Sequence, residues 1–109
     1  MIVDFSKIDA QLIEGFKGGS GELVMRSFDD GNCKIMLSTL RAGARAGKHV
    51  HDDSCEVILV LEGELTFFEN GIEEVCRVGQ AHYCQKGHSH WFENRTKTDV
   101  RYFAIVPKT

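Results

Sequence analysis

The sequence predicts an all-β protein, and three observations lead to this fold class. Short segments rich in Val, Ile, Phe and Tyr recur along the chain. Glycines separate successive segments at a fixed interval of eight residues, at Gly63, Gly71, Gly79 and Gly87. No segment keeps a helical apolar period over about ten positions, as an amphipathic helix would. Short strands with a turn signal every eight to twelve residues or so are typical of a β-sandwich or barrel.

The first elements are the least distinct. Residues 8–16 (IDAQLIEGF) fit either a short helical turn or an edge segment, and the glycines of residues 17–21 (KGGSG) indicate a turn. Strands over residues 23–28 and 34–40 flank Asp30-Gly31, a dipeptide that favours a tight hairpin. Asn70-Gly71 predicts a second hairpin. The remaining strands are expected over residues 56–61, 64–69, 73–78, 90–94 and 100–106, with another short one at residues 82–84.

Length and composition predict one domain, with residues 1–22 as an amino-terminal arm and residues 23–107 as the barrel. The 109 residues are 42% apolar, which is enough for a core and argues against disorder. Thirteen basic residues against sixteen acidic ones give a net charge of −3. This balance argues against a nucleic acid or an anionic membrane surface as the main partner.

Cellular location is expected to be cytoplasmic. Asp4, Lys7 and Asp9 interrupt any apolar core of a signal peptide, and no stretch reaches the length of a membrane span. The four cysteines form no CxxC pair and show no zinc-finger spacing. We therefore expect free thiols in a reducing compartment.

All five histidines fall within residues 49–90, and this clustering indicates a metal site. In a strand, His49 and His51 point to the same face, about 6.6 Å apart. Glu56 begins a very apolar strand, where a carboxylate is costly unless it is paired or bound to a cation. His90 offers a third imidazole from a separate strand. Three nitrogens and one anionic oxygen suit manganese, iron, nickel, copper or zinc better than calcium or magnesium. A solitary histidine, or an HxH pair alone, is more often an ordinary surface or core feature.

The glycines around these histidines resemble the two motifs of the cupin family. The first runs from Gly43 through His49, His51 and Glu56 to Gly63 without a gap. The second runs through Gly79, Gln85, Gly87, His90 and Asn94, with Gln85 where the family has proline. Nine of the ten motif positions match in register.

The resemblance implies a small jelly-roll barrel, also called a double-stranded β-helix, with one divalent transition metal inside. It carries over His49, His51, Glu56 and His90 as the metal ligands. Gln85 removes a locked φ angle, so the loop leading to His90 is expected to be looser or differently turned.

Beyond the ligands, Phe92, His82, Cys84 and Tyr102 are candidates for lining the cavity, together with Phe67 and Met36. His82 and Cys84 share one face of their strand, but the loop before His90 leaves open which face this is. A surface position is the preferred interpretation of His82, and His88 is expected to be exposed in a turn. Arg41, Arg45 and Lys48 precede the histidine pair and are interpreted as a solvated edge rather than a site for an anion.

The leading functional hypothesis is a mononuclear metalloenzyme that acts on a small molecule, with a preference for dioxygenase-type oxidation over isomerase or lyase chemistry. The alternatives are a non-catalytic module that binds or senses a small ligand, and a metal that only stabilises the barrel. A homodimer is expected because so small a jelly roll leaves sheet edges to be covered, and the segment through Phe28 is the candidate to pack across the interface.

Overall fold

The computed structural model describes residues 1–109 as ten strands and two short 3₁₀ helices. The helices are η1 (Phe5–Lys7) and η2 (Phe16–Gly18). The strands are β1 (Gln11–Glu14), β2 (Glu22–Asp29), β3 (Cys33–Leu40), β4 (Arg45–Val50), β5 (Glu56–Glu62), β6 (Glu64–Glu69), β7 (Ile72–Arg77), β8 (Ala81–Cys84), β9 (Ser89–Glu93) and β10 (Val100–Pro107). No helix is long and apolar enough to cross a membrane.

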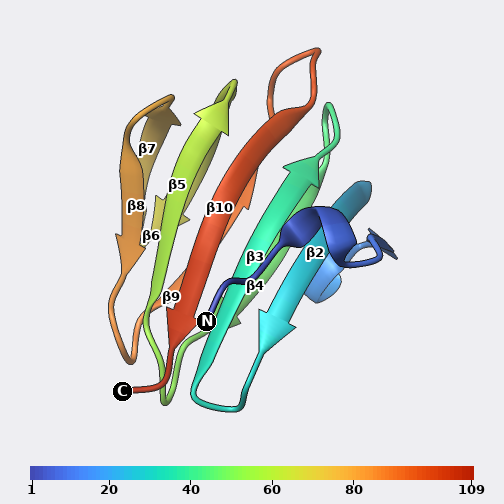
Figure 1. Ribbon diagram of the computed structural model, residues 1–109. Helices are drawn as coiled ribbons and strands as arrows, with labels where there is room; N and C mark the ends of the chain where they lie inside the picture. Colours follow the sequence, from blue (N-terminus) through green and yellow to red (C-terminus); the bar gives the residue numbers. More distant parts are fainter.

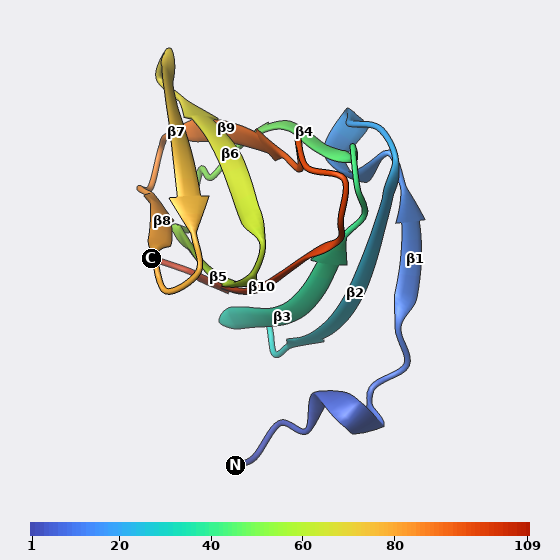
Figure 2. The same ribbon diagram turned by 90° about the horizontal axis from the view of Figure 1, so that it is seen from above.

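Two antiparallel sheets face each other and enclose the core (Figure 1). The larger sheet has the order β1-β2-β3-β10-β5-β8, and the smaller has the order β4-β9-β6-β7. Seen from above, the two sheets curve around a common interior (Figure 2). This arrangement is consistent with a double-stranded β-helix and confirms the predicted all-β fold class.

The core forms where the inward-facing residues of the two sheets meet. Strand alternation turns every second residue inward, so buried residues of β3 lie opposite buried residues of β10: Met36 pairs with Ala104, and Leu40 with Val100. Aromatic rings fill the middle. Phe92 lies 5.0 Å from Phe67 and 5.7 Å from Tyr102, measured between ring centroids. The metal-site candidates described below lie at one end of this core.

The predicted strands and hairpins are confirmed, with boundaries within one residue of those expected. β2 and β3 form the first hairpin, and β6 and β7 form the second across Asn70-Gly71. The glycines at the eight-residue interval have φ angles of 82°, 76°, 83° and 84°, a left-handed conformation that favours glycine over other residues. The fixed spacing therefore marks the positions where the chain reverses.

The amino-terminal region forms an edge strand, the second of the two alternatives that the sequence left open. β1 pairs with β2 at the border of the larger sheet. The preceding residues lie against the outer face of that sheet, where the Phe5 and Phe103 rings are 6.2 Å apart. The Arg26 guanidinium also donates hydrogen bonds to the carbonyl oxygens of Phe5 and Ile8.

β4 lies at the edge of the smaller sheet and carries an irregularity that alternation alone does not predict. Ala46 and Gly47 are neighbours, yet both are buried, and the pairing with β9 shifts register between Ala46 and His49. One extra residue in an antiparallel strand produces such a shift. The bulge turns His49 toward the interior of the barrel.

η2 is held against this bulge by two glycines that allow the backbones to touch. A Cβ atom on Gly19 would lie 2.0 Å from the Arg45 carbonyl oxygen, and one on Gly47 would lie 2.1 Å from the Lys17 carbonyl oxygen. We call this the glycine contact. It brings η2, and with it Phe16 and Lys17, next to the strand that carries His49.

Asn94 joins three segments through its buried side chain. Its amide nitrogen donates to the carbonyl oxygens of Leu40 (3.0 Å) and Thr98 (2.8 Å), while its amide oxygen accepts from the backbone nitrogen and hydroxyl of Thr96. This one side chain thus makes four hydrogen bonds. Asn94 therefore has a structural role in the second motif.

We expect the Asn94→Ala substitution to lower the free energy of unfolding by about 3 kcal/mol, because it removes four hydrogen bonds, including the buried one to the Leu40 carbonyl. Urea denaturation followed by circular dichroism measures the change. Asn32→Ala, at an exposed turn position, is the matched control and should change stability by less than about 0.5 kcal/mol. Equal effects of the two substitutions would contradict the structural role of Asn94.

Candidate metal centre

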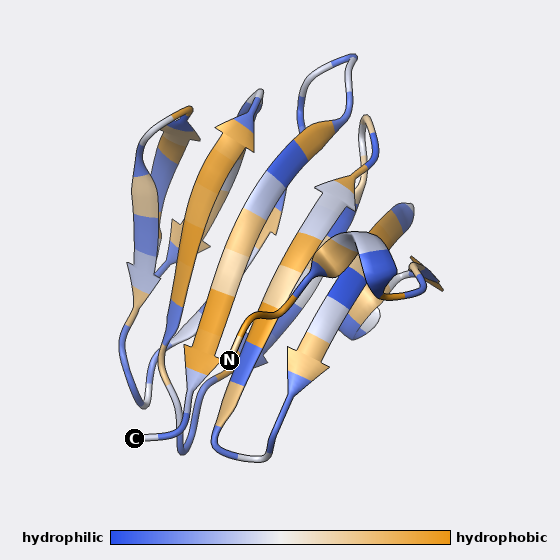
Figure 3. Ribbon diagram, in the orientation of Figure 1, coloured by the Kyte–Doolittle hydropathy of each residue, from blue (hydrophilic) through white to orange (hydrophobic).

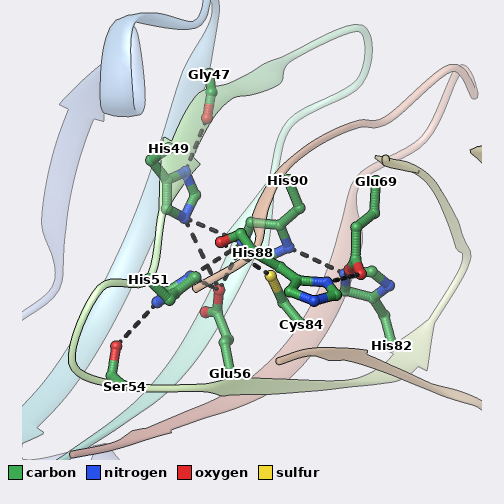
Figure 4. A network of polar contacts seen from close by, with 10 residues as sticks. All are labelled: Gly47, His49, His51, Ser54, Glu56, Glu69, His82, Cys84, His88 and His90. Atoms are coloured by element: carbon green, nitrogen blue, oxygen red, sulfur yellow. Dashed lines mark hydrogen bonds and ion pairs between the residues drawn. The ribbon is translucent and has the colours of Figure 1, made fainter. Parts of the chain in front are cut away.

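Three histidines and one glutamate converge inside the barrel from both sheets (Figure 4). His49 lies on β4, His51 directly follows that strand, and His90 lies on β9. Glu56 is the first residue of β5, in the opposite sheet. The structure thus brings together all four residues that the sequence predicted as ligands.

The donor atoms lie within hydrogen-bonding distance of more neighbours than their protons can serve. Nε2 of His90 is 3.1 Å from Nε2 of His49, 3.2 Å from Nε2 of His51 and 3.0 Å from Oε1 of Glu56. Nε2 of His51 lies 3.2 Å from the same carboxylate oxygen, and Nε2 of His49 lies 3.9 Å from it. A neutral imidazole nitrogen carries at most one proton, so it cannot satisfy three such neighbours.

The second ring nitrogen of each histidine points away from the cluster and has its own partner. His49 donates its Nδ1 proton to the Gly47 carbonyl oxygen at 2.8 Å, because a carbonyl can only accept. Nδ1 of His51 lies 3.1 Å from the Ser54 hydroxyl, and Nδ1 of His90 lies 3.0 Å from Nε2 of His82. Partners of this kind orient histidine ligands in metal sites and fix their tautomer. The Gly47 carbonyl thereby leaves the Nε2 lone pair of His49 facing the cluster.

Glu56 completes an anionic donor set. Its side chain is 9% exposed, and Oε1 has no regular hydrogen-bond partner although it is buried. Burial alone would raise the pKa of Glu56, but His49, His51 and His90 together hold that pKa well below the ordinary value. A carboxylate and three imidazoles suit a divalent transition metal. A bound cation would also give the buried Oε1 atom of Glu56 the partner that it lacks.

The turn before His90 closes without the proline of the resembled motif. The Gln85 carbonyl accepts from the His88 backbone nitrogen at 3.0 Å. Gly87 donates to the His51 carbonyl at 2.6 Å, and the His51 nitrogen donates to the His88 carbonyl at 3.0 Å. These backbone bonds hold the turn against His51, so two of the candidate ligands are positioned together.

A cavity of about 240 Å³ leads from the surface to the donor atoms. Phe92, Tyr102 and Met36 line it, as the sequence predicted, whereas Phe67 does not. Burial raises the pKa of Tyr102, which keeps its hydroxyl protonated. Sequence reasoning missed several other lining residues, which are Phe16, Lys17, Met25, Lys34 and Ser54. Most of these come from distant segments, and no local pattern marks them.

The charged residues just before the histidine pair lie outside this cavity, in agreement with their interpretation as a solvated edge. Arg41 forms ion pairs with Glu22 and Asp99, and Arg45 lies over the Trp91 ring. Lys48 is exposed. The two lysines that do line the cavity, Lys17 and Lys34, come from other parts of the chain.

The surface interpretation of His82 was wrong: its side chain is only 10% exposed and points inward. The ring stacks on Phe67 at 4.0 Å and faces a second cavity, of about 390 Å³, on the other side of the ligand cluster. Burial, and then the proximity of His90, lowers the pKa of His82 to about 4, so its ring is neutral. The pairing of β8 with β5 sets this orientation, since His82 lies opposite the buried Ile58, and this register is not encoded in the strand itself.

Cys84 also points inward and is fully buried. Its thiol lies 3.8 Å from the His88 carbonyl oxygen, and burial followed by nearby carboxylates raises its pKa to about 12. His88 is partly exposed in the turn, and its Nδ1 lies 3.0 Å from Oε2 of Glu69. Glu69 was not singled out from the sequence, because no motif marks the end of β6 as part of a site.

Comparisons with known proteins agree with this geometry. A family model described as "Cupin domain" matches residues 36–106. An oxalate-binding protein from Thermotoga maritima is 30% identical over 112 residues, which cover 97% of this chain and 93% of that protein. The crystal structure of a predicted oxalate decarboxylase from the same organism superposes with a TM-score of 0.92 at 27% identity, over all of both chains.

A more distant structure shows the same fold. A sugar phosphate isomerase of the cupin superfamily from Silicibacter pomeroyi has a TM-score of 0.80 at 20% identity, and the match covers all of this chain and 76% of that one. The fold is therefore shared with proteins that are named for different functions.

Proposed function

Because the chain belongs to the cupin family, we propose that it binds one divalent transition-metal ion through His49, His51, Glu56 and His90 and, at that ion, a small carboxylate of the oxalate class. The convergence of the four donor atoms at the end of a small cavity carries this proposal. When bound, such an ion supplies Lewis-acid attraction for oxygen ligands. Four protein donors leave positions for a bidentate ligand on an ion that prefers six.

The cavity supports a small anionic ligand. A volume of about 240 Å³ is at or below the lower end of typical small-molecule sites. Lys17 and Lys34 contribute positive charge to its wall, and Ser54 and Tyr102 contribute hydroxyl groups. The oxalate-binding relative, similar over almost its whole length, supports the same class of ligand.

The residues of the cavity favour a protein that binds its carboxylate ligand without converting it. Decarboxylation requires a group that delivers a proton to the carbon that loses carbon dioxide. Glu56 is the only carboxyl group in the cavity wall, and the proposal assigns it to the metal. Lys17 and Lys34 serve the ligand as fixed charges.

Isothermal titration calorimetry of the manganese-loaded protein with oxalate tests the proposal. We expect one oxalate per chain, recovered unchanged after incubation, and no binding by metal-free protein. Acetate, which has a single carboxylate, serves as the control and should bind at least tenfold more weakly. Absence of oxalate binding by the loaded protein would rule the proposal out.

A second candidate function is dioxygenase-type oxidation of a small apolar molecule. The apolar part of the cavity wall favours it, since Phe16, Met25, Met36 and Phe92 lie on the way to the donor atoms. Iron-loaded protein should then consume dioxygen when it is offered diketones, phenols or thiols. An electrode that records no uptake across this panel would exclude it.

Lys17 is expected to contribute to anion binding. Its backbone has a φ angle of 55°, uncommon for a residue other than glycine, and the glycine contact holds it beside the cavity. Lys17→Gln should weaken oxalate binding about fivefold to tenfold, the loss expected for one charged contact. Lys48→Gln removes an exposed lysine outside the cavity and is the control for net charge. Equal affinity of both variants would contradict the role of Lys17.

We also propose that the chain forms a homodimer through the outer face of its larger sheet. Ile105 is flanked there by its strand partners Ile35 and Val57, and Phe103, which Phe5 of the same chain contacts, by Leu37 and Leu59. These side chains are only partly buried. Figure 3 shows that β5 consists largely of apolar residues. Sedimentation equilibrium at micromolar concentration should give twice the mass of 12.2 kDa. A single species of monomer mass would refute the dimer.

A further inference from the structure

We propose that His82 is a positioning residue for the metal: its Nε2 lone pair accepts the Nδ1 proton of His90 and so keeps Nε2 of His90 free to bind the ion. The two nitrogens are 3.0 Å apart. This inference rests on the proposed metal site and assigns to that site a histidine that contributes no ligand atom to it.

The tautomer of His90 is not fixed by a partner that can only accept a proton. For His49 the partner is the Gly47 carbonyl, which can only accept a proton and therefore fixes the tautomer. The partner of His90 is another imidazole, which can either donate or accept. If His82 donated, the proton of His90 would move to Nε2 and occupy the lone pair that the ion needs. The tautomer of His82 thus decides whether His90 can be a ligand.

The geometry favours a hydrogen bond in the plane of both rings. The His82 and His90 planes are only 17° apart, and a ring-nitrogen lone pair lies in the ring plane. Phe67 holds the His82 ring from one face, with 15° between the planes. His90 is completely buried, so no solvent molecule replaces the His82 acceptor at low cost.

Glu69 is the other group that faces this nitrogen of His82. Its Oε1 lies 3.5 Å from Nε2 of His82, farther than His90 does, and it has no hydrogen-bond partner. The second oxygen, Oε2, is next to Nδ1 of His88 at 3.0 Å. Oε1 forms no hydrogen bond with His82, so the nearest polar neighbour of Nε2 of His82 is Nδ1 of His90, at 3.0 Å.

Two substitutions separate an acceptor from a space-filling ring. His82→Phe keeps the stacking on Phe67 but removes the acceptor, and it should weaken cobalt(II) binding by about tenfold to a hundredfold. His82→Gln places an amide oxygen near the position of Nε2 and should restore the affinity to within about threefold of the original protein. His88→Phe is the matched control, since the His88 side chain contacts Glu69 of the same polar network and no ligand side chain, and the substitution keeps its backbone carbonyl.

Calorimetry with cobalt(II) gives the affinities, and the visible absorption of the bound cobalt reports whether His90 still coordinates. Nitrogen-15 NMR of the zinc-loaded original protein reads the tautomer directly and needs no variant to fold. We expect the proton of His82 on Nδ1. A proton on Nε2 would overturn the inference, as would His82→Phe binding cobalt as tightly as the original protein. Failure of the original protein to bind any metal would instead refute the proposed function.

Discussion

Replacing His51 with alanine is expected to reduce the bound metal from about one ion per chain to almost none. The imidazole supplies one of four donor atoms that lie within 4.8 Å of one another, and its side chain is only 9% exposed. Removal of a direct ligand should cost more than the roughly hundredfold loss that follows from disturbing the partner of a ligand. Elemental analysis of untagged protein measures the stoichiometry and identifies the metal.

The same variant tests whether the metal contributes to stability. An ion present at a hundred times its dissociation constant stabilises the folded state by about 2.7 kcal/mol. Its removal with a chelator should therefore lower the melting temperature of the original protein by about 10 °C and leave His51→Ala unaffected. His88→Ala, which removes a histidine outside the donor set, should bind and respond like the original protein. Full metal content in His51→Ala would contradict the assigned ligands.

Gly47→Ala is expected to destabilise the protein by about 3 kcal/mol or more. The new Cβ atom would lie 2.1 Å from the Lys17 carbonyl oxygen, and a backbone atom cannot move aside as a side chain can. The backbone would have to shift, and η2 would separate from β4. Because the Gly47 carbonyl also holds Nδ1 of His49, metal affinity should fall together with stability.

Gly71→Ala separates this clash from the general cost of losing a glycine. Gly71 has a φ angle of 76° and no atom within 4 Å of the added Cβ atom, so its substitution should cost about 1 to 2 kcal/mol from backbone strain alone. Gly19→Ala should resemble Gly47→Ala, since its Cβ atom would lie 2.0 Å from the Arg45 carbonyl oxygen. Chemical denaturation of the three variants gives the comparison. A smaller loss at Gly47 than at Gly71 would show that the glycine contact is unimportant.

Much of this architecture was predictable from the sequence, because its signals are local. Strand alternation and turn glycines act over a few residues, so the hairpins at Asp30-Gly31 and Asn70-Gly71 were located correctly. The four convergent donors were also found, since His49, His51 and Glu56 form a short pattern and His90 occupies its expected place in the second motif.

The remaining features depend on contacts between distant segments. Phe16 and Lys17 reach the cavity only because Gly19 and Gly47 allow two backbones to touch. The irregularity at Ala46 and Gly47 changes the alternation of β4 without any distinctive residue type. The inward direction of His82 is set by the pairing of β8 with β5, where His82 lies opposite the buried Ile58. Such features follow from the assembled backbone, and no pattern within one strand encodes them.

The donor atoms come from both sheets, with His49 and His90 on the smaller sheet and Glu56 on the larger. A bound ion would therefore act as a reversible cross-link between two layers that are otherwise held together by side-chain packing. A link of this kind slows separation of the sheets, so unfolding would await release of the ion. Metal supply in the cell would then set how long each molecule survives, as well as whether it can bind its ligand.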